Sequence, residues 1–359
     1  MKRNSCLFTM GLLSTMPAPL LADTLKPFFH AETFLHSEPI ALDAVDKQWE
    51  GTYHPNGNKQ LASVWVESGV KKGNWSLGLL YREVHQLNFD SETADLYYTV
   101  ENNQSLTAGQ QYQLDLDAYR YRGAGVRVNR HFEPTSTLQL SAGTSLFVAS
   151  NIMDGSLTGS AKANADDDYE YFITGDYLYS EDVLFGRKNL DKPTGLGLSL
   201  DLSLDWQPNP QWHATASIKD LAGAIFWKDV PYTEATANSA TTSIDESGFT
   251  QVNPVLTGFE GYQDSHTQRL KPTIDVRLDY RVRESSPAVS LKYKHIDSLN
   301  LFALGGSRAV GRGKLALHYW PQIETLEADY QGKKLGVSMA IDDMDISEAR
   351  TFWLSLSYR

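Results

Sequence analysis

The sequence has 359 residues but almost no cysteine, no long apolar run and no excess of positive charge. Its one cysteine is Cys6, so a disulfide framework and thiol chemistry are both excluded. No segment reaches the roughly 20 consecutive apolar residues that a transmembrane helix needs. The formal net charge is -12, and because phosphate contacts need a basic surface, we expect no nucleic-acid partner.

Catalytic motifs are also missing. Residues 305–309 resemble a nucleophile elbow, but Ala309 replaces the last glycine and no strand-to-helix context follows, so a hairpin turn is the favoured interpretation. A phosphate loop fails at Arg312, which stands in place of the lysine. The nine histidines show no metal-ligand spacing. We therefore predict that the chain is not an enzyme and that it needs no cofactor and no metal.

The N-terminus has the layout of a secretory signal peptide. Lys2 and Arg3 precede an apolar run from Leu7 to Leu21, and Ala22 is a small residue suited to cleavage. We expect residues 1–22 to be this signal peptide, which would carry Cys6 away. A large exported chain without disulfides indicates a bacterial envelope.

A strict alternation of apolar and polar residues marks the stretch 195–212. The leucines at 196, 198, 200, 202 and 204 alternate with small and acidic residues, and Trp206 and Trp212 flank a turn that contains two prolines. Such spacing places the leucines on one face of a β-strand. Aromatic residues at the ends of apolar strands are typical of strands in a bilayer, so we predict interface aromatics at Trp206, Trp212, Phe352 and Tyr358.

The segment 270–283 is the charged counterpart of that strand. Its apolar residues alternate with acids and arginines, and such a strand is favourable only when its charged face is wet. This pattern predicts a polar barrel interior. The predicted lumen-lining residues are Asp201, Asp205, Asp275, Arg277, Asp279, Arg281 and Arg283.

Similar alternating segments recur along the chain between turn signals. They predict an all-β fold, namely a single antiparallel transmembrane β-barrel over residues 23–359 with about 14 strands, within a range of 12–16. Glu92 to Val100 is expected to be one of these strands.

Three segments interrupt the expected barrel. Ile40 to Glu50 has the spacing of a short amphipathic helix, so residues 37–59 form either a plug inside the barrel or a surface loop. Residues 228–268 are polar and are expected to form a long loop, either on the surface or folded inward. Asp166 to Asp168 are expected at a solvated hairpin tip rather than at a cation site.

The C-terminal half resembles a known group of barrels. Phe352, Leu354, Leu356 and Tyr358 alternate up to the end of the chain, as in the C-terminal strand by which outer-membrane barrels are recognised for assembly. The segment GLGLSLDLSLDWQPNPQWHATASIKDLAGAIFW and the later strands are similar to barrels of the long-chain fatty-acid transporter (FadL)-like group, including the TraF-type conjugation-associated barrels.

This resemblance and the alternation together predict an integral barrel in the outer membrane of a Gram-negative bacterium. Its expected function is a channel or transporter for small solutes. Its expected partners are outer-membrane lipid, lipopolysaccharide and the barrel assembly machinery. Two alternatives stay open: a plugged structural barrel that supports a surface appendage or conjugation system, and a soluble periplasmic β-sandwich.

Overall fold

The computed structural model of the protein describes residues 25–164, 169–184, 186–240, 242–244, 250–252, 255–283 and 286–359. The expected signal peptide, residues 1–22, and the aspartates at 166–168 lie outside this set. Within the described part of the chain, no helix is both long enough and apolar enough to span a membrane.

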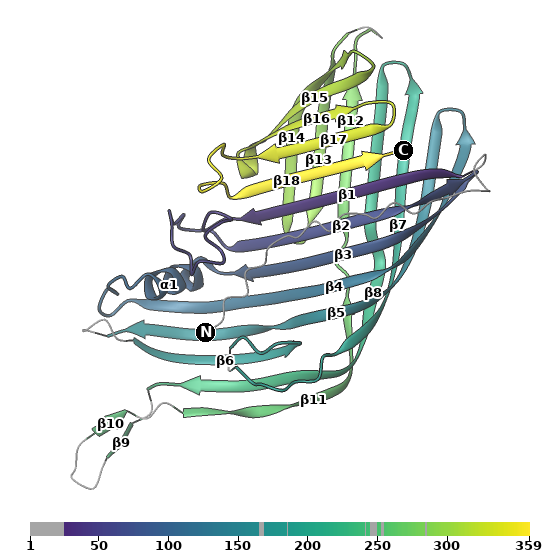
Figure 1. Ribbon diagram of the computed structural model, residues 1–359. Coiled ribbons are helices and arrows are strands. Elements are labelled where there is room, and N and C mark those ends of the chain that lie inside the picture. Colours follow the sequence, from purple (N-terminus) through teal and green to yellow (C-terminus); the bar gives the residue numbers. More distant parts are fainter. Residues whose placement is uncertain are drawn as a thin grey trace.

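The chain closes into one antiparallel β-barrel (Figure 1). The ring closes where the first strand pairs with the last, with Phe34 opposite Trp353. The 14 barrel positions are filled, in chain order, by β1 (Lys26–Ser37), β2 (Lys59–Lys72), β3 (Trp75–Phe89), β4 (Gln111–Thr135), β5 (Leu138–Ala163), β7 (Thr194–Asn209), β8 (Trp212–Asn238), β12 (Thr273–Tyr280), β13 (Ala288–Ile296), β14 (Leu299–Val310), β15 (Gly313–Trp320), β16 (Thr325–Gln331), β17 (Leu335–Ile341) and β18 (Thr351–Tyr358).

Two further strands extend the barrel wall. β6 (Tyr169–Tyr179) pairs with β5 and β8, as β7 does, so β6 and β7 are two parts of one barrel position interrupted by residues 180–193. β11 (Val255–Arg269) and β12 both pair with β8 and are likewise one interrupted position. The predicted barrel of about 14 strands is thereby confirmed.

The outer surface of the barrel is apolar and its inner surface is polar. Along β7, Leu198 and Leu200 are 46% and 47% exposed, whereas their neighbours Ser199 and Asp201 are 0% and 3% exposed. Exposed leucines beside buried polar groups reverse the pattern of a soluble protein, and they suit a wall in contact with lipid. A closed barrel of this kind excludes the alternative of a soluble β-sandwich.

The two ends of the barrel differ in their connections. At one end lie short turns, such as residues 73–74 and 311–312, together with the start of β1 and the end of β18. At the other end lie the long connections 38–58 and 90–110. Outer-membrane barrels have short periplasmic turns and longer external loops, so the short-turn end faces the periplasm.

The barrel wall is also uneven in height (Figure 1). β4, β5 and β8 have 25, 26 and 27 residues, whereas β15, β16 and β17 have 8, 7 and 7. A strand needs about 9–11 residues to cross the hydrocarbon core, so the tall wall of β4–β8 rises far beyond the membrane. The short wall of β12–β18 ends near the membrane surface.

The predicted helix at Ile40 to Glu50 is wrong, because residues 42–49 form turns. The predicted strand at Glu92 to Val100 is also wrong, because α1 (Ser91–Glu101) occupies it. Asp90 caps this helix by accepting a hydrogen bond from the Thr93 backbone N–H at 2.8 Å.

Segment 37–59 is a loop on the outer side of the barrel rather than a plug. Its buried residues pack with α1 against Leu87 and Phe89. These two side chains occupy the same alternate positions of β3 as the exposed Leu77 and Leu79, so they face outward.

The expected long loop at 228–268 is largely strand. β8 continues to Asn238, β11 begins at Val255, and the two pair along their length. Near the tip of this hairpin lie the short strands β9 (Thr242–Ile244) and β10 (Thr250–Val252), which pair with each other. The polar composition that suggested a loop reflects strands that project beyond the membrane.

Candidate functional site

The barrel lumen is the candidate functional site, and its contents change along the barrel axis. At the short-turn end lies a cavity of about 430 Å³ that both polar and apolar side chains line. It reaches from Lys71 and Glu133, beside the short turns, to Trp320 and Trp353 deeper in the barrel. Its polar lining includes Ser141, Ser203, Asp205, Ser217, Asp275 and Arg277.

Ion pairs cross the lumen at mid-height. Glu32 on β1 accepts hydrogen bonds from Lys219 Nζ on β8 at 2.6 Å and from Lys294 Nζ on β13 at 3.1 Å. Arg82 on β3 donates to Asp220 on β8, with Nη1 2.8 Å from Oδ1. None of these strand pairs is adjacent in the sheet, so each contact joins opposite parts of the wall.

An inward bulge of β8 makes two of these contacts. In the pairing of β7 with β8, residues 219–221 stand opposite the single residue Asp201. Asp220 adopts a left-handed backbone conformation with φ 56°, and its backbone N–H donates to Asp201 Oδ1 at 2.8 Å. The extra residues turn Asp220 into the lumen beside Lys219, which already holds a lumenal position of β8 opposite Thr273.

Arg82 is the centre of the mid-lumen contacts. Its side chain is 3% exposed, and its guanidinium lies 5.1–5.2 Å from the ring centres of Trp65, Tyr121 and Phe147. Its partner Asp220 is 5% exposed. Breaking a buried pair by removing one partner costs about 3–5 kcal/mol, so these residues hold the two walls firmly together.

Little space remains beside these ion pairs. A cavity of about 40 Å³ is lined by Glu32, Arg82, Lys219, Asp220 and Lys294. A cavity needs about 10–15 Å³ of this kind of volume to hold a water molecule, so this one has room for only a few.

Buried ionic contacts also line the short wall. Asp279 accepts hydrogen bonds from Ser290, Arg277 and Lys314 at 2.5, 3.0 and 2.7 Å. Glu327 accepts from Lys292, Ser338 and the Trp320 indole N–H at 2.7, 2.7 and 3.0 Å. These short-wall charges are therefore paired within their own wall.

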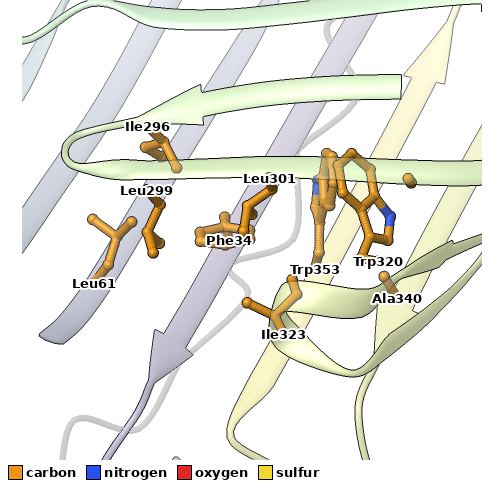
Figure 2. Packing of buried hydrophobic residues seen from close by; sticks show 10 residues of the cluster. Phe34, Leu61, Ile296, Leu299, Leu301, Trp320, Ile323, Ala340 and Trp353 are labelled. Atoms are coloured by element: carbon orange, nitrogen blue, oxygen red, sulfur yellow. The ribbon is translucent and has the colours of Figure 1, made fainter. Parts of the chain in front are cut away.

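Apolar side chains fill the lumen toward the loop end. Figure 2 shows Phe34, Leu301, Trp320 and Trp353 pointing toward one another from strands on different sides of the cluster. The rings of Phe34 and Trp353 meet edge to face with centres 5.8 Å apart. A second cluster on the tall wall contains Tyr119, Tyr121, Phe147, Ile225 and Trp227. This end of the lumen is packed like the core of a soluble protein.

The structure places five of the seven predicted lumen residues on lumenal strand positions. Asp201 accepts a hydrogen bond from Arg127 Nε at 2.9 Å, and Asp205 lies 3.0 Å from His213 Nε2. Asp275 lies 2.8 Å from Lys294 Nζ, and Arg277 pairs with Asp279 at 3.0 Å.

Arg281 and Arg283 are not lumenal strand residues. β12 ends at Tyr280, so both arginines lie in the connection to β13, where the alternation of the segment 270–283 has stopped. The alternating sequence pattern continues for three residues beyond the end of the strand.

The predicted interface aromatics divide between the two ends. Trp206, Trp212 and Tyr358 are 45%, 39% and 39% exposed and lie at the short-turn end, where Trp212 packs on Tyr280 with ring centres 4.6 Å apart. Phe352 lies at the loop end of β18. The tryptophan pair therefore marks the periplasmic side of the wall.

Sequence reasoning missed the residues that cross the lumen, namely Glu32, Arg82, Lys219, Asp220 and Lys294. A signal for the bulge was present, because two neighbouring charged residues at 219–220 cannot both take the polar face of a regular strand. Glu32 carried no such signal, since its strand alternates only weakly.

A closed wall with an apolar exterior and a polar, ion-paired interior defines a transmembrane β-barrel of the Gram-negative outer membrane. The chain belongs to the family described as "Family of unknown function (DUF5723)", whose profile matches residues 53–341. The 14-strand closed barrel is consistent with the FadL-like group that the sequence resembles. Among curated proteins no sequence matches.

Solved structures of outer-membrane barrels are similar to this chain over most of its length. The P. putida toluene transporter TodX is 10% identical, with 95% of this chain and 91% of that chain covered and a TM-score of 0.42. The ferric-catecholate import receptor Fiu from E. coli K12 is 9% identical, with 88% and 64% covered and a TM-score of 0.26. A BenF-like porin from Pseudomonas fluorescens Pf-5 is 10% identical, with 94% and 98% covered and a TM-score of 0.18. What this chain does has to be inferred from its own residues.

Proposed function

We propose that this barrel is a channel for small solutes and that the inward bulge of β8 is the part that opens. The observation that carries the proposal is the contrast between the cavity of about 430 Å³ at the short-turn end and the cavity of about 40 Å³ at the ion pairs. The larger volume is typical of a ligand pocket, which spans about 300–1,000 Å³. The smaller one has room for only a few water molecules, so a larger solute can pass only when the ion pairs separate.

Polar solutes suit this lumen best. The hydroxyl groups of Ser141, Ser203 and Ser217 and the charges of Asp205 and Arg277 line the cavity. Such groups can replace part of the hydration shell of a polar solute, while Leu204 and Val276 in the same lining can contact its apolar parts. The outward-facing leucines would contact lipid, and the external loops would contact lipopolysaccharide. In keeping with the missing catalytic motifs, we assign no enzymatic activity to the barrel.

The channel proposal is tested by single-channel recording in planar bilayers with wild-type protein and Asp220→Ala. The substitution removes the bond that Arg82 makes across the lumen. Loss of a hydrogen bond to a charged group corresponds to about 1.5–3 kcal/mol. Since 1.4 kcal/mol is a factor of ten, the open probability should rise at least about tenfold.

Glu83→Gln is the matched control. It neutralises the partner of Arg122 one residue further along β3, on the outward face, where the contact is 3.0 Å long. The control should conduct as the wild type does. The channel proposal would be overturned if neither the wild type nor Asp220→Ala conducted. Both proteins must first show the heat-modifiable migration of a folded barrel.

A closed structural barrel is the second candidate, because the apolar cluster around Phe34 and Trp353 fills the lumen at the loop end. In that case the cluster and the ion pairs are a permanent core. An absence of conductance in both the wild type and Asp220→Ala would favour this structural barrel over the channel. The side chains that fill the lumen would then come from the barrel strands, and not from the segments 37–59 and 228–268 that the sequence offers as a plug.

A further inference from the structure

An outward-facing arginine lies at the periplasmic rim of the tall wall. Arg130 is exposed on β4 and stands opposite Trp75, the first residue of β3, at the short-turn end. It shares its face of β4 with Val126 and Val128, which are 42% and 40% exposed on the lipid side. A positive charge on the lipid-facing side of a barrel is unfavourable unless it reaches the polar interface. Arg130 therefore depends on polar groups outside the barrel.

Two aromatic rings hold this guanidinium in place. Its Cζ atom lies 5.0 Å from the ring centre of Trp75 and 5.2 Å from that of Phe132. Stacking on a ring uses the flat face of a guanidinium and leaves the N–H groups at its edge to donate. Among the residues that the structure describes, no carboxylate forms an ion pair with Arg130. A fixed positive charge at the rim is thus open to an anion from outside the chain.

An apolar groove of about 340 Å³ begins beside Arg130. Phe132 lines it, and so does Ala142, the residue opposite Arg130 on β5. Leu202 on β7 and Ile218 on β8 continue the same row across the wall and also line the groove. Leu202 is 46% exposed, on the outward face of β7. Because the alanine is much shorter than its neighbours, the lipid-facing surface is hollowed there.

The row of the groove climbs from the rim into the membrane. At its β4 end, Arg130 is level with the first residue of β3. At its β8 end, Ile218 lies well beyond Trp212, the aromatic residue that begins β8 on the periplasmic side. Strands tilt in a barrel, so a row perpendicular to them changes depth from strand to strand. A ligand that fills this row has a polar end at the rim and an apolar part at the depth of the hydrocarbon.

We propose that Arg130 and this groove bind one anionic phospholipid of the periplasmic leaflet. The phosphate accepts hydrogen bonds from the guanidinium, and one acyl chain follows the row of Ala142, Leu202 and Ile218. The positive charge of Arg130 favours a headgroup with net negative charge. Lipopolysaccharide does not fit, because it occupies the opposite leaflet. The site lies outside the lumen, so it stands whether or not the barrel conducts.

The test is native mass spectrometry of the purified barrel, released from detergent micelles after titration with dioleoyl phosphatidylglycerol. We expect the wild type to retain one lipid saturably. Arg130→Gln should bind it at least about tenfold more weakly, since a charged hydrogen bond is lost. Ala142→Phe should also weaken binding, because the added ring fills the groove while Arg130 stays in place. Inorganic phosphate, which has the anion but no chain, should not bind measurably.

Arg308→Gln is the matched control. Arg308 is also exposed at the short-turn end, opposite the outward-facing Leu315, but it lies on the short wall and not at the groove. This variant should retain the lipid as the wild type does. All four proteins must first show the heat-modifiable migration of a folded barrel. Unchanged affinity in Arg130→Gln or Ala142→Phe, an equal loss in Arg308→Gln, or equal retention of dioleoyl phosphatidylcholine would overturn the proposal.

Discussion

The two halves of the lumen are built on opposite principles. Toward the short turns, serine hydroxyls, charged groups and some apolar side chains line a cavity of about 430 Å³. Toward the loops, Phe34 and Leu301 are both 1% exposed and belong to one apolar cluster with Trp320 and Trp353, which also line that cavity. Between the halves, Arg82 and Asp220 join opposite walls. One barrel thus combines an aqueous vestibule with a packed core.

This difference shows that a barrel wall and its filling carry separate functions. The outward alternation of apolar residues holds the wall in lipid everywhere, whatever lies inside. Closing the lumen is left to a few inward side chains and to the bulge at 219–221. Opening the barrel as proposed requires those residues and the apolar cluster at the loop end to rearrange while the wall stays intact.

The largest effect is expected in the packed half. Phe34→Ala removes a ring that packs edge to face on Trp353, and Phe→Ala substitutions in cores cost about 3–5 kcal/mol. The free energy of unfolding, measured by guanidinium titration in lipid vesicles, should fall by about that amount. A loss below about 1 kcal/mol would show that the loop half is not a packed core.

An intermediate effect is expected when the vestibule is filled. Ser217→Phe adds a ring where the cavity has room, so the free energy of unfolding should change by less than about 1 kcal/mol. Conductance should fall to about half or less, because the added ring narrows the polar path. Unchanged conductance of the open state would mean that solutes do not pass through this cavity.

The smallest effect is expected from Ser203→Ala. Its hydroxyl lies 2.5 Å from the hydroxyl of Ser141 across β5 and β7, but the pair borders the water-accessible cavity. A neutral hydrogen bond beside water contributes only about 0.5–1.5 kcal/mol. Thermal stability should therefore drop far less than in Phe34→Ala. If Ser203→Ala lowered thermal stability as much as Phe34→Ala does, the two halves of the lumen would not differ in packing as described.

Much of the wall was predictable from sequence. The alternation of leucine with polar residues at 195–206 specifies a strand with one apolar face, and repetition of that pattern gives the number of barrel positions. Asp201, Asp205, Asp275, Arg277 and Asp279 were placed on the polar face by parity alone, and the structure puts them on lumenal strand positions. Parity works because side chains in a strand must alternate.

The filling of the lumen was not predictable in the same way. Parity says which residues share a face, but it does not say whether that face is wet. Phe34, Trp320 and Trp353 face inward although they are apolar, and their contacts come from strands far apart in sequence. The alternating pattern predicts a strand where α1 forms, and the sequence signal for the helix is Asp90, whose side chain caps its first turn.

The most direct test of the account is thiol labelling of two cysteine variants, since Cys6 is the one native cysteine and can be replaced by serine as background. Ser203→Cys places a thiol in the vestibule, and Ala303→Cys places one in the packed half, where Ala303 is 3% exposed. A membrane-impermeant thiol reagent added from the periplasmic side should label Ser203→Cys rapidly and Ala303→Cys far more slowly. Equal labelling rates at the two positions would contradict the account.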